Sequence, residues 1–191
     1  MSRPNIIAGK YRGKKINVPE QDGLRPTTSR IREMLFNWLQ TDIIDLSTLD
    51  LFAGSGLLSF EALSRGAQSA TLIEKNPKAY QALKKNATFL KNEAIKIINL
   101  DSLIFLKKNS LKNYQLLFID PPFTSTLGDE ILHALQDKLA PGTLIYIESP
   151  KEIVELPFKA DRLKSKRVGQ VYSSLFITNW YFFKKVAKIR G

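Results

Sequence analysis

The fold is decided by residues 49–56, LDLFAGSG, where an apolar run ends in two closely spaced glycines. Such a run predicts a buried strand, and the glycines predict a tight turn that opens a helix over about residues 56–65. Gly54 and Gly56 let the backbone adopt positive φ and approach a bound ligand closely. The stretch is therefore expected to form the first strand and ligand-facing turn of an α/β fold.

Apolar and helical segments alternate through the rest of the chain. We expect strands at 48–52, 70–74, 95–99, 116–119 and 143–148, and helices at 56–65, 77–91, 102–109 and 127–138. The second helix begins Asn76-Pro77, an N-cap followed by proline at the first helical position. This order predicts a doubly wound, mostly parallel α/β sheet covered on both faces. Segments 170–178 and 179–184 are expected to add two antiparallel strands at its edge, which makes seven.

The N-terminal part has a different pattern. Segments 6–11 and 14–18 flank Arg12-Gly13, which predicts a short basic β-hairpin, and a helix is expected over 29–39. Isolated hairpins are marginal in water, so this one must pack against the main domain or a partner. We therefore divide the chain into a basic N-terminal appendage, residues 1–26, and a main domain, residues 27–191.

Composition excludes several kinds of site. The chain has 191 residues, no cysteine and one histidine, which rules out disulfides, a cysteine nucleophile and zinc or multi-histidine metal sites. His133 lies in a helical pattern and is expected to be an ordinary helix residue. No apolar run approaches the length of a membrane span and the first residues lack a secretory segment, so a cytoplasmic protein is expected. A monomer is the default expectation.

Positive charge is concentrated at the two ends of the chain. The net charge is +11, of which residues 1–32 carry +6 and residues 159–191 carry +8, so the middle carries −3. Two basic flanks around a mildly acidic middle favour a polyanion-binding surface beside a site with another task. The alternative is that both flanks are solvated charged faces.

A second informative stretch is residues 116–123, LLFIDPPF. Proline donates no ladder hydrogen bond and favours an extended residue before it, so the strand must end and Asp120 lies at its carboxyl end. Ligand crevices of open α/β sheets lie at that edge. The Asp120 carboxylate, the Pro121 carbonyl and the Phe123 ring together suit a flat base that carries an amino group. An ordinary Asp-Pro turn is the alternative.

Acidic residues follow the next strands. Glu74 lies twenty residues after Gly54, where its carboxylate can accept hydrogen bonds from ribose hydroxyls. Asp101 follows the third strand and could meet an adenine edge. The dinucleotide fingerprint is incomplete, because Ser59 occupies the position of its third glycine or alanine, and no phosphate-binding loop is present.

These motifs resemble the ordered motifs of class I S-adenosylmethionine-dependent methyltransferases. The resemblance implies a Rossmann-like methyltransferase sheet with S-adenosylmethionine as the cofactor. It implies that the methionine part lies over the turn, that Asp50 supports this turn or the methionine ammonium, and that the next two acidic sites hold ribose and adenine. The implied cofactor-binding residues are Asp50, Phe52, Gly54, Ser55, Gly56, Glu74, Asp101 and Ser102, and the implied catalytic residues are Asp120, Pro121 and Phe123.

The flanking segments narrow the resemblance. Residues 7–15, 24–28, 31–39, 146–149 and 168–172 resemble the bacterial small-subunit ribosomal RNA guanine-N2 methyltransferase family, often called RsmD-like. The resemblance implies methylation of guanine N2 in 16S rRNA, within the small ribosomal subunit or its assembly intermediate. The residues expected to contact RNA are Lys10, Arg12, Lys14, Lys15 and Arg25. For Arg25, the alternative is a structural role in holding the hairpin to the core.

The sequence leaves two other functions open. A DNA adenine-N6 methyltransferase would use the same Asp-Pro-Pro-Phe motif, against which stands the lack of a sizeable target-recognition domain. A non-catalytic ribosome-assembly factor would keep the basic flanks, against which stand the intact Asp120 and glycine turn.

Overall fold

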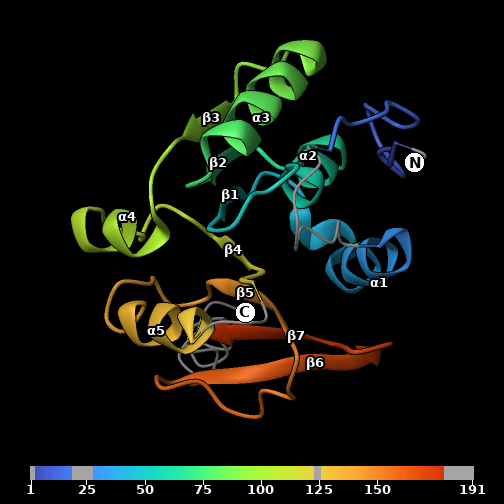
Figure 1. Ribbon diagram of the computed structural model, residues 1–191. Helices are drawn as coiled ribbons and strands as arrows, with labels where there is room; N and C mark the ends of the chain where they lie inside the picture. Colours follow the sequence, from blue (N-terminus) through green and yellow to red (C-terminus); the bar gives the residue numbers. More distant parts are fainter. Residues whose placement is uncertain (1–2, 19–27, 123–125, 179–191) are drawn as a thin grey trace, which may run out of the picture.

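The computed structural model describes residues 3–18, 28–122 and 126–178 of the chain (Figure 1). No helix in these ranges is long and apolar enough to cross a membrane. The elements follow in the order α1 (Ser29–Leu39), a 3-10 helix (Gln40–Ile43), β1 (Ser47–Asp50), α2 (Leu57–Ser64), β2 (Ser69–Ile73), α3 (Pro77–Leu90), β3 (Ile95–Ile98), α4 (Ser102–Lys108), β4 (Leu116–Ile119), α5 (Leu127–Ala134), β5 (Leu144–Ser149), β6 (Ala160–Val168) and β7 (Val171–Thr178).

The strands form one sheet in the order β3-β2-β1-β4-β5-β7-β6. Strands β1 to β5 pair in parallel, and β7 adds antiparallel to β5. The predicted seven-stranded, mostly parallel sheet is therefore confirmed. The chain runs outward from β1 to β3 and then returns to place β4 on the other side of β1. This reversal lies at the carboxyl ends of β1 and β4, which is where sheets of this kind bind their ligands.

Side chains of the central strands alternate between two apolar layers. On β4, Leu116 and Phe118 pack into the layer that holds α1, α2 and α3, whereas Leu117 and Ile119 pack into the layer with α4 and α5. The helices lie on the two faces of the sheet in the same division (Figure 1). Both faces of the central strands are thus covered, which explains their continuous apolar runs.

The antiparallel edge differs in part from the sequence prediction. Strand β7 confirms the segment 170–178, but its outer partner is β6, residues 160–168, which was not predicted. Most of β6 is exposed and carries no apolar alternation, so only its pairing with β7 makes it a strand. The expected strand at 179–184 lies outside the described residues.

Helix ends agree with the sequence prediction where a cap is present. The Asn76 side chain accepts hydrogen bonds from the N–H groups of Lys78 and Ala79, and α3 starts there as expected. Helix α5 was predicted to reach residue 138 but ends at Ala134, and the turns that follow include Asp137 at φ 60°. A left-handed residue of this kind cannot continue a right-handed helix.

The predicted N-terminal hairpin is only partly formed. Its two predicted segments lie within residues 3–18, where the structure has no β-strand. The chain reverses there around one bridge, Asn5 to Lys15, and the N–H groups of Ile6, Gly13 and Ile16 donate across the reversal to backbone carbonyls. Other backbone donors of this loop bind α2: the N–H groups of Ile7 and Ala8 donate to the Glu61 carboxylate at 2.8 and 3.1 Å, and that of Lys10 donates to the Ser64 carbonyl at 2.8 Å. Donors that are used in this way are not available to lengthen the hairpin ladder.

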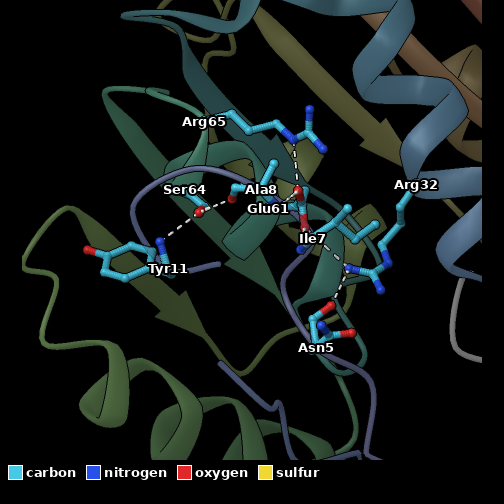
Figure 2. Close-up of polar contacts among 8 residues, drawn as sticks. All are labelled: Asn5, Ile7, Ala8, Tyr11, Arg32, Glu61, Ser64 and Arg65. Atoms are coloured by element: carbon cyan, nitrogen blue, oxygen red, sulfur yellow. Dashed lines mark hydrogen bonds and ion pairs between the residues drawn. The ribbon is translucent and has the colours of Figure 1, made fainter. Parts of the chain in front are cut away.

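Glu61 is the centre of this attachment (Figure 2). Its carboxylate is fully buried and also accepts from Arg65 Nε at 2.7 Å and Arg32 Nη1 at 3.4 Å. Burial lowers the pKa of the Arg32 guanidinium, and the charge of Glu61 opposes this shift. The loop itself lies directly on α2, because a Cβ at Gly9 would stand 1.7 Å from the Ser64 carbonyl oxygen. The loop is therefore an integral part of the α2 face.

Glu61→Gln should destabilise the protein by about 3 kcal/mol, because the amide cannot replace a buried charge that accepts four donors. Urea unfolding measures the change in free energy. The exposed Glu93→Gln is the matched control and should stay within about 0.5 kcal/mol of the parent. Trypsin should cut the basic loop of the Glu61 variant faster than that of the control. Equal unfolding free energies for the two variants would contradict this role.

Candidate active site

The glycine turn joins β1 to α2 at the carboxyl edge of the sheet. Gly54 and Gly56 adopt φ of 51° and 81°, and a Cβ at Gly56 would stand 2.4 Å from the Phe60 ring. A hydrogen bond to β2 holds the turn in place, since the Ala53 N–H donates to the Ile73 carbonyl at 3.0 Å. Glycine is therefore required at Gly56 both by conformation and by space.

Asp50 lies beneath this turn and not on its surface. Its carboxylate is 2% exposed and accepts from Ser59 Oγ at 2.9 Å and from the Phe52 N–H at 3.2 Å. Burial raises the pKa of Asp50 to about 7; these two hydrogen bonds oppose the shift, and the charges of Asp120 and Glu74 add to it. The contacts of Asp50 are those of a residue that supports the turn.

Glu74 and Asp101 follow β2 and β3 at the same edge. The two Glu74 oxygens accept from the N–H groups of Gly54, at 2.9 Å, and Asn76, at 2.7 Å, so this half-buried carboxylate holds the glycine turn in place. Asp101 caps α4 through the Leu103 N–H at 2.9 Å.

Three further predicted cofactor residues lie around the turn. The Ser102 hydroxyl donates into the interior, to the Leu51 carbonyl. Phe52 is half-buried against the α4–α5 layer, and Ser55 is 6% exposed. The carbonyl of Ser55 accepts from the Asn86 side chain of α3 at 3.4 Å. The structure thus gathers all eight predicted cofactor residues at the carboxyl ends of β1, β2 and β3.

Asp120 and Pro121 lie at the same edge of the sheet as the glycine turn, on the neighbouring strand. They follow β4, whose four residues are all buried, and β4 pairs with β1 so that Asp50 lies opposite Phe118. Asp120 is half-buried, Pro121 is buried and Pro122 is exposed. The catalytic and cofactor candidates therefore meet at the topological switch point. Phe123 lies outside the described residues.

The basic N-terminal loop lies away from this edge. Lys10 and Tyr11 contact Ser64, the last residue of α2, and Lys14 Nζ stands 5.0 Å from the ring of Phe89 near the end of α3. Since α2 starts at the carboxyl edge, the contact of Lys10 with Ser64 lies about 12 Å along it, the length of an eight-residue helix. The segment returns towards the edge at Asn17, because the Asn86 side chain of α3 donates to both the Asn17 and the Ser55 carbonyls. Lys10, Arg12 and Lys15 are exposed and Lys14 is half-buried; Arg25 lies outside the described residues.

Sequence reasoning missed a buried polar group beside Asp120. The Tyr146 hydroxyl donates to Glu148 Oε1 at 2.9 Å and contacts Ser173 Oγ at 3.1 Å. Burial raises the pKa of Tyr146 well above its ordinary value, and the charges of Glu148 and Asp120 add to the shift. The sequence signal was the pair of polar residues at alternate positions of an otherwise apolar strand.

The arrangement places acceptors along the carboxyl edge of the sheet. The carboxylates of Glu74, Asp101 and Asp120, which follow β2, β3 and β4, suit ligands that carry hydroxyl, amino or cationic groups. Among residues 3–18, 28–122 and 126–178, no cluster of three or more acidic or histidine side chains could hold a metal ion. The chemistry that these residues support is therefore binding and orientation of donor-rich ligands.

Comparisons with known proteins agree with this geometry. Residues 4–177 match the family model described as Conserved hypothetical protein 95. The chain is 42% identical to "Ribosomal RNA small subunit methyltransferase D" of Escherichia coli, over 92% of this chain and 94% of that protein. Its structure is similar to that of "Putative methyltransferase yhhF" of Escherichia coli, with a TM-score of 0.84, 42% identity and coverage of 93% and 98%.

A more distant structure shares the fold alone. This is an RNA methyltransferase from Salinibacter ruber in complex with S-adenosyl-L-homocysteine, with a TM-score of 0.64 and 13% identity, covering 81% of this chain and 94% of that one.

The raised pKa of Asp50 predicts a pH-dependent stability. The folded state holds a proton that the unfolded chain releases near pH 4, so this stabilisation is full below pH 4 and is lost as pH rises through about 7. Between pH 5 and 7.5 the loss should be on the order of 3 kcal/mol relative to Asp50→Asn, whose amide stays neutral. Urea unfolding of both proteins across this range measures it. Parallel pH curves would contradict the assignment.

Proposed function

The chain belongs to the family described as Conserved hypothetical protein 95, which its similarity to the rRNA methyltransferase D of Escherichia coli identifies as RsmD-like, and we propose that it methylates the exocyclic N2 of a guanine in 16S rRNA. S-adenosylmethionine is the methyl donor. The observation that carries the proposal is the position of Asp120 and Pro121 across the switch point from the glycine turn.

The residues at the carboxyl edge fit this cofactor. The glycines at 54 and 56 allow close approach of the methionine part, and Asp50 beneath them supports the turn. The Glu74 oxygens, each already accepting one backbone N–H, can accept ribose hydroxyls with their remaining lone pairs. The backbone N–H of Ser102 and the carboxylate of Asp101 would contact the adenine. When bound, the cofactor supplies an electrophilic methyl group.

The chain's own task is to orient the amine. The lone pair of a guanine amino group is delocalised into the ring, which makes the nitrogen a poor nucleophile. The Asp120 carboxylate and the Pro121 carbonyl would accept its two N–H bonds and favour the rehybridised nitrogen, while Phe123 would stack on the base. As the new N–C bond forms and the bond from the methyl group to the cofactor sulfur breaks, the nitrogen would become positive, and Asp120 would stabilise that charge until the proton leaves to water.

The basic loop would contact RNA at a distance from the target base. Lys10, Arg12, Lys14 and Lys15 lie beyond the ends of α2 and α3, so we assign them to phosphates that position the protein and not to base selection. Arg25 is a further candidate contact. We assign the whole segment 1–26 to an RNA-facing appendage, of which residues 7–11 are bound to α2.

The substrate would be the small ribosomal subunit or its assembly intermediate, which places the protein in the cytoplasm. One copy of the chain carries all the proposed residues.

Labelled cofactor offered to purified small subunits, naked 16S rRNA and DNA tests the activity. We expect label in the rRNA of subunits, recovered as N2-methylguanine after nuclease digestion and mass spectrometry. Label as N6-methyladenine in DNA would replace this proposal with the adenine methyltransferase, and RNA binding without transfer would favour the assembly factor.

Asp120→Ala should reduce single-turnover methyl transfer by about 10³-fold or more, because the variant loses both orientation and charge stabilisation. Cofactor affinity, measured by calorimetry, should change less than about threefold, since Asp120 faces the base. Asp120→Asn keeps one acceptor oxygen and should retain intermediate activity. Parallel loss of transfer and cofactor affinity would show that Asp120 belongs to the cofactor side.

A further inference from the structure

A set of cations on the outer hairpin of the sheet has no part in the site described so far. Strand β6 is exposed from Arg162 to Arg167 and carries four basic side chains in those six positions. Arg162 pairs with Glu152 at 2.8 Å. Lys164 and Lys166 form no ion pair within the described ranges of the chain. Their charge is therefore available to a partner.

The sheet register places this hairpin at the carboxyl edge. Ile119 of β4 lies opposite Ile147 of β5, so Asp120 and Glu148 continue the two strands side by side. Glu148 lies opposite Ser173 of β7, and Ser173 lies opposite Lys166 of β6. Lys166 is thus in the row of Asp120, three strand spacings or about 14 Å away.

The next row adds an aromatic ring. Ser149 lies opposite Tyr172, and Tyr172 lies opposite Arg167. The Arg167 guanidinium stands 5.2 Å from the centre of the Tyr172 ring, and its Nε donates to the Gly169 carbonyl at 3.0 Å. These contacts fix the guanidinium and leave its other donors for a ligand. A stacked arginine suits phosphate better than a lysine does.

A shallow groove runs along this strand. Its volume is about 460 Å³, and basic side chains and Tyr172 line most of it. A strip of positive charge beside an aromatic ring is complementary to the backbone and bases of single-stranded RNA. The lining residues that matter here are Arg162, Lys164, Lys166, Arg167 and Tyr172.

We propose that the β6–β7 hairpin is a second RNA-contact surface, which holds the RNA backbone on the side of the target base opposite to the glycine turn. The inference rests on the proposed function and adds a site to it. The N-terminal loop lies towards the other edge of the sheet, whereas Lys166 and Arg167 of β6 lie in the rows of the edge that carries Asp120. At 14 Å, beyond the screening length of about 8 Å in physiological salt, they would act through phosphate contacts and not through their field on Asp120.

Protection of an edge strand is the competing explanation. Lysines on edge strands prevent pairing with another chain, and β6 is such a strand. The two explanations differ in what a charge-neutral variant does. RNA contact requires a change in the Michaelis constant for RNA at unchanged oligomeric state, whereas edge protection requires association of the variant at unchanged Michaelis constant.

The test is the full-length triple variant Lys164→Gln, Lys166→Gln, Arg167→Gln, assayed with purified small subunits. We expect the KM for subunits to rise about tenfold or more, with little change in kcat or cofactor affinity. With naked 16S rRNA, the slope of log affinity against log salt should become shallower by about 2, for three lost contacts to single-stranded RNA. The double variant Lys164→Arg, Lys166→Arg, which keeps the charge, should behave as the parent.

The matched control is Lys107→Gln, Lys108→Gln, Lys112→Gln. These exposed lysines lie after the start of α4 towards the opposite edge of the sheet, and their loss changes the net charge equally. An equal rise in KM for the triple variant and the control would show that the effect comes from the net charge alone, and it would overturn the proposal. So would an unchanged KM and salt slope, or self-association of the triple variant as its only defect. If the parent protein transfers no methyl group to any RNA, the proposed function fails, and the salt slope of RNA binding still decides whether this surface contacts RNA.

Discussion

Complete burial of α2 is the constraint on which the rest of the structure depends. All eight residues of this helix are buried, and three of them carry polar side chains that must therefore find partners inside the protein. Ser59 donates to Asp50 beneath the glycine turn. Glu61 and Ser64 bind the backbone of the N-terminal loop. One helix thus holds the cofactor turn at its start and the basic loop at its end, so both are parts of one rigid unit.

The central strands and the site at their ends could be predicted from sequence because local signals and tertiary structure agree there. Strand β4 is a continuous apolar run stopped by proline, and the turn after β1 is marked by two glycines that the observed φ values require. The positions of Asp120 and Glu74 follow from those strand ends alone. That both lie at one edge of the sheet followed from the expected parallel pairing of these strands.

Other parts could not be predicted because their stability comes from partners far away in the chain. Strand β6 has the composition of a charged loop and exists through its pairing with β7. The N-terminal segment has the alternation of a hairpin, yet its donors at Ile7 and Ala8 are taken by Glu61, more than 50 residues further along the chain. A lone carboxylate inside the apolar segment 57–64 was the one available signal that this helix needs buried partners.

The segregation of charge along the chain has a physical reason in the chemistry that the site performs. The cofactor bears a sulfonium and an ammonium, and in the proposed reaction the guanine nitrogen would become positive as it is methylated, so acidic strand ends would favour both. The same carboxylates repel RNA phosphates. Cations that attract RNA would compete with the cofactor if they stood inside the crevice, and they can serve the reaction only from outside it. An acidic middle between two basic flanks therefore suits methyl transfer to a polyanion, and the fold places Lys10 of one flank at the far end of α2 and the cations of β6, from the other flank, on the outer strand of the sheet.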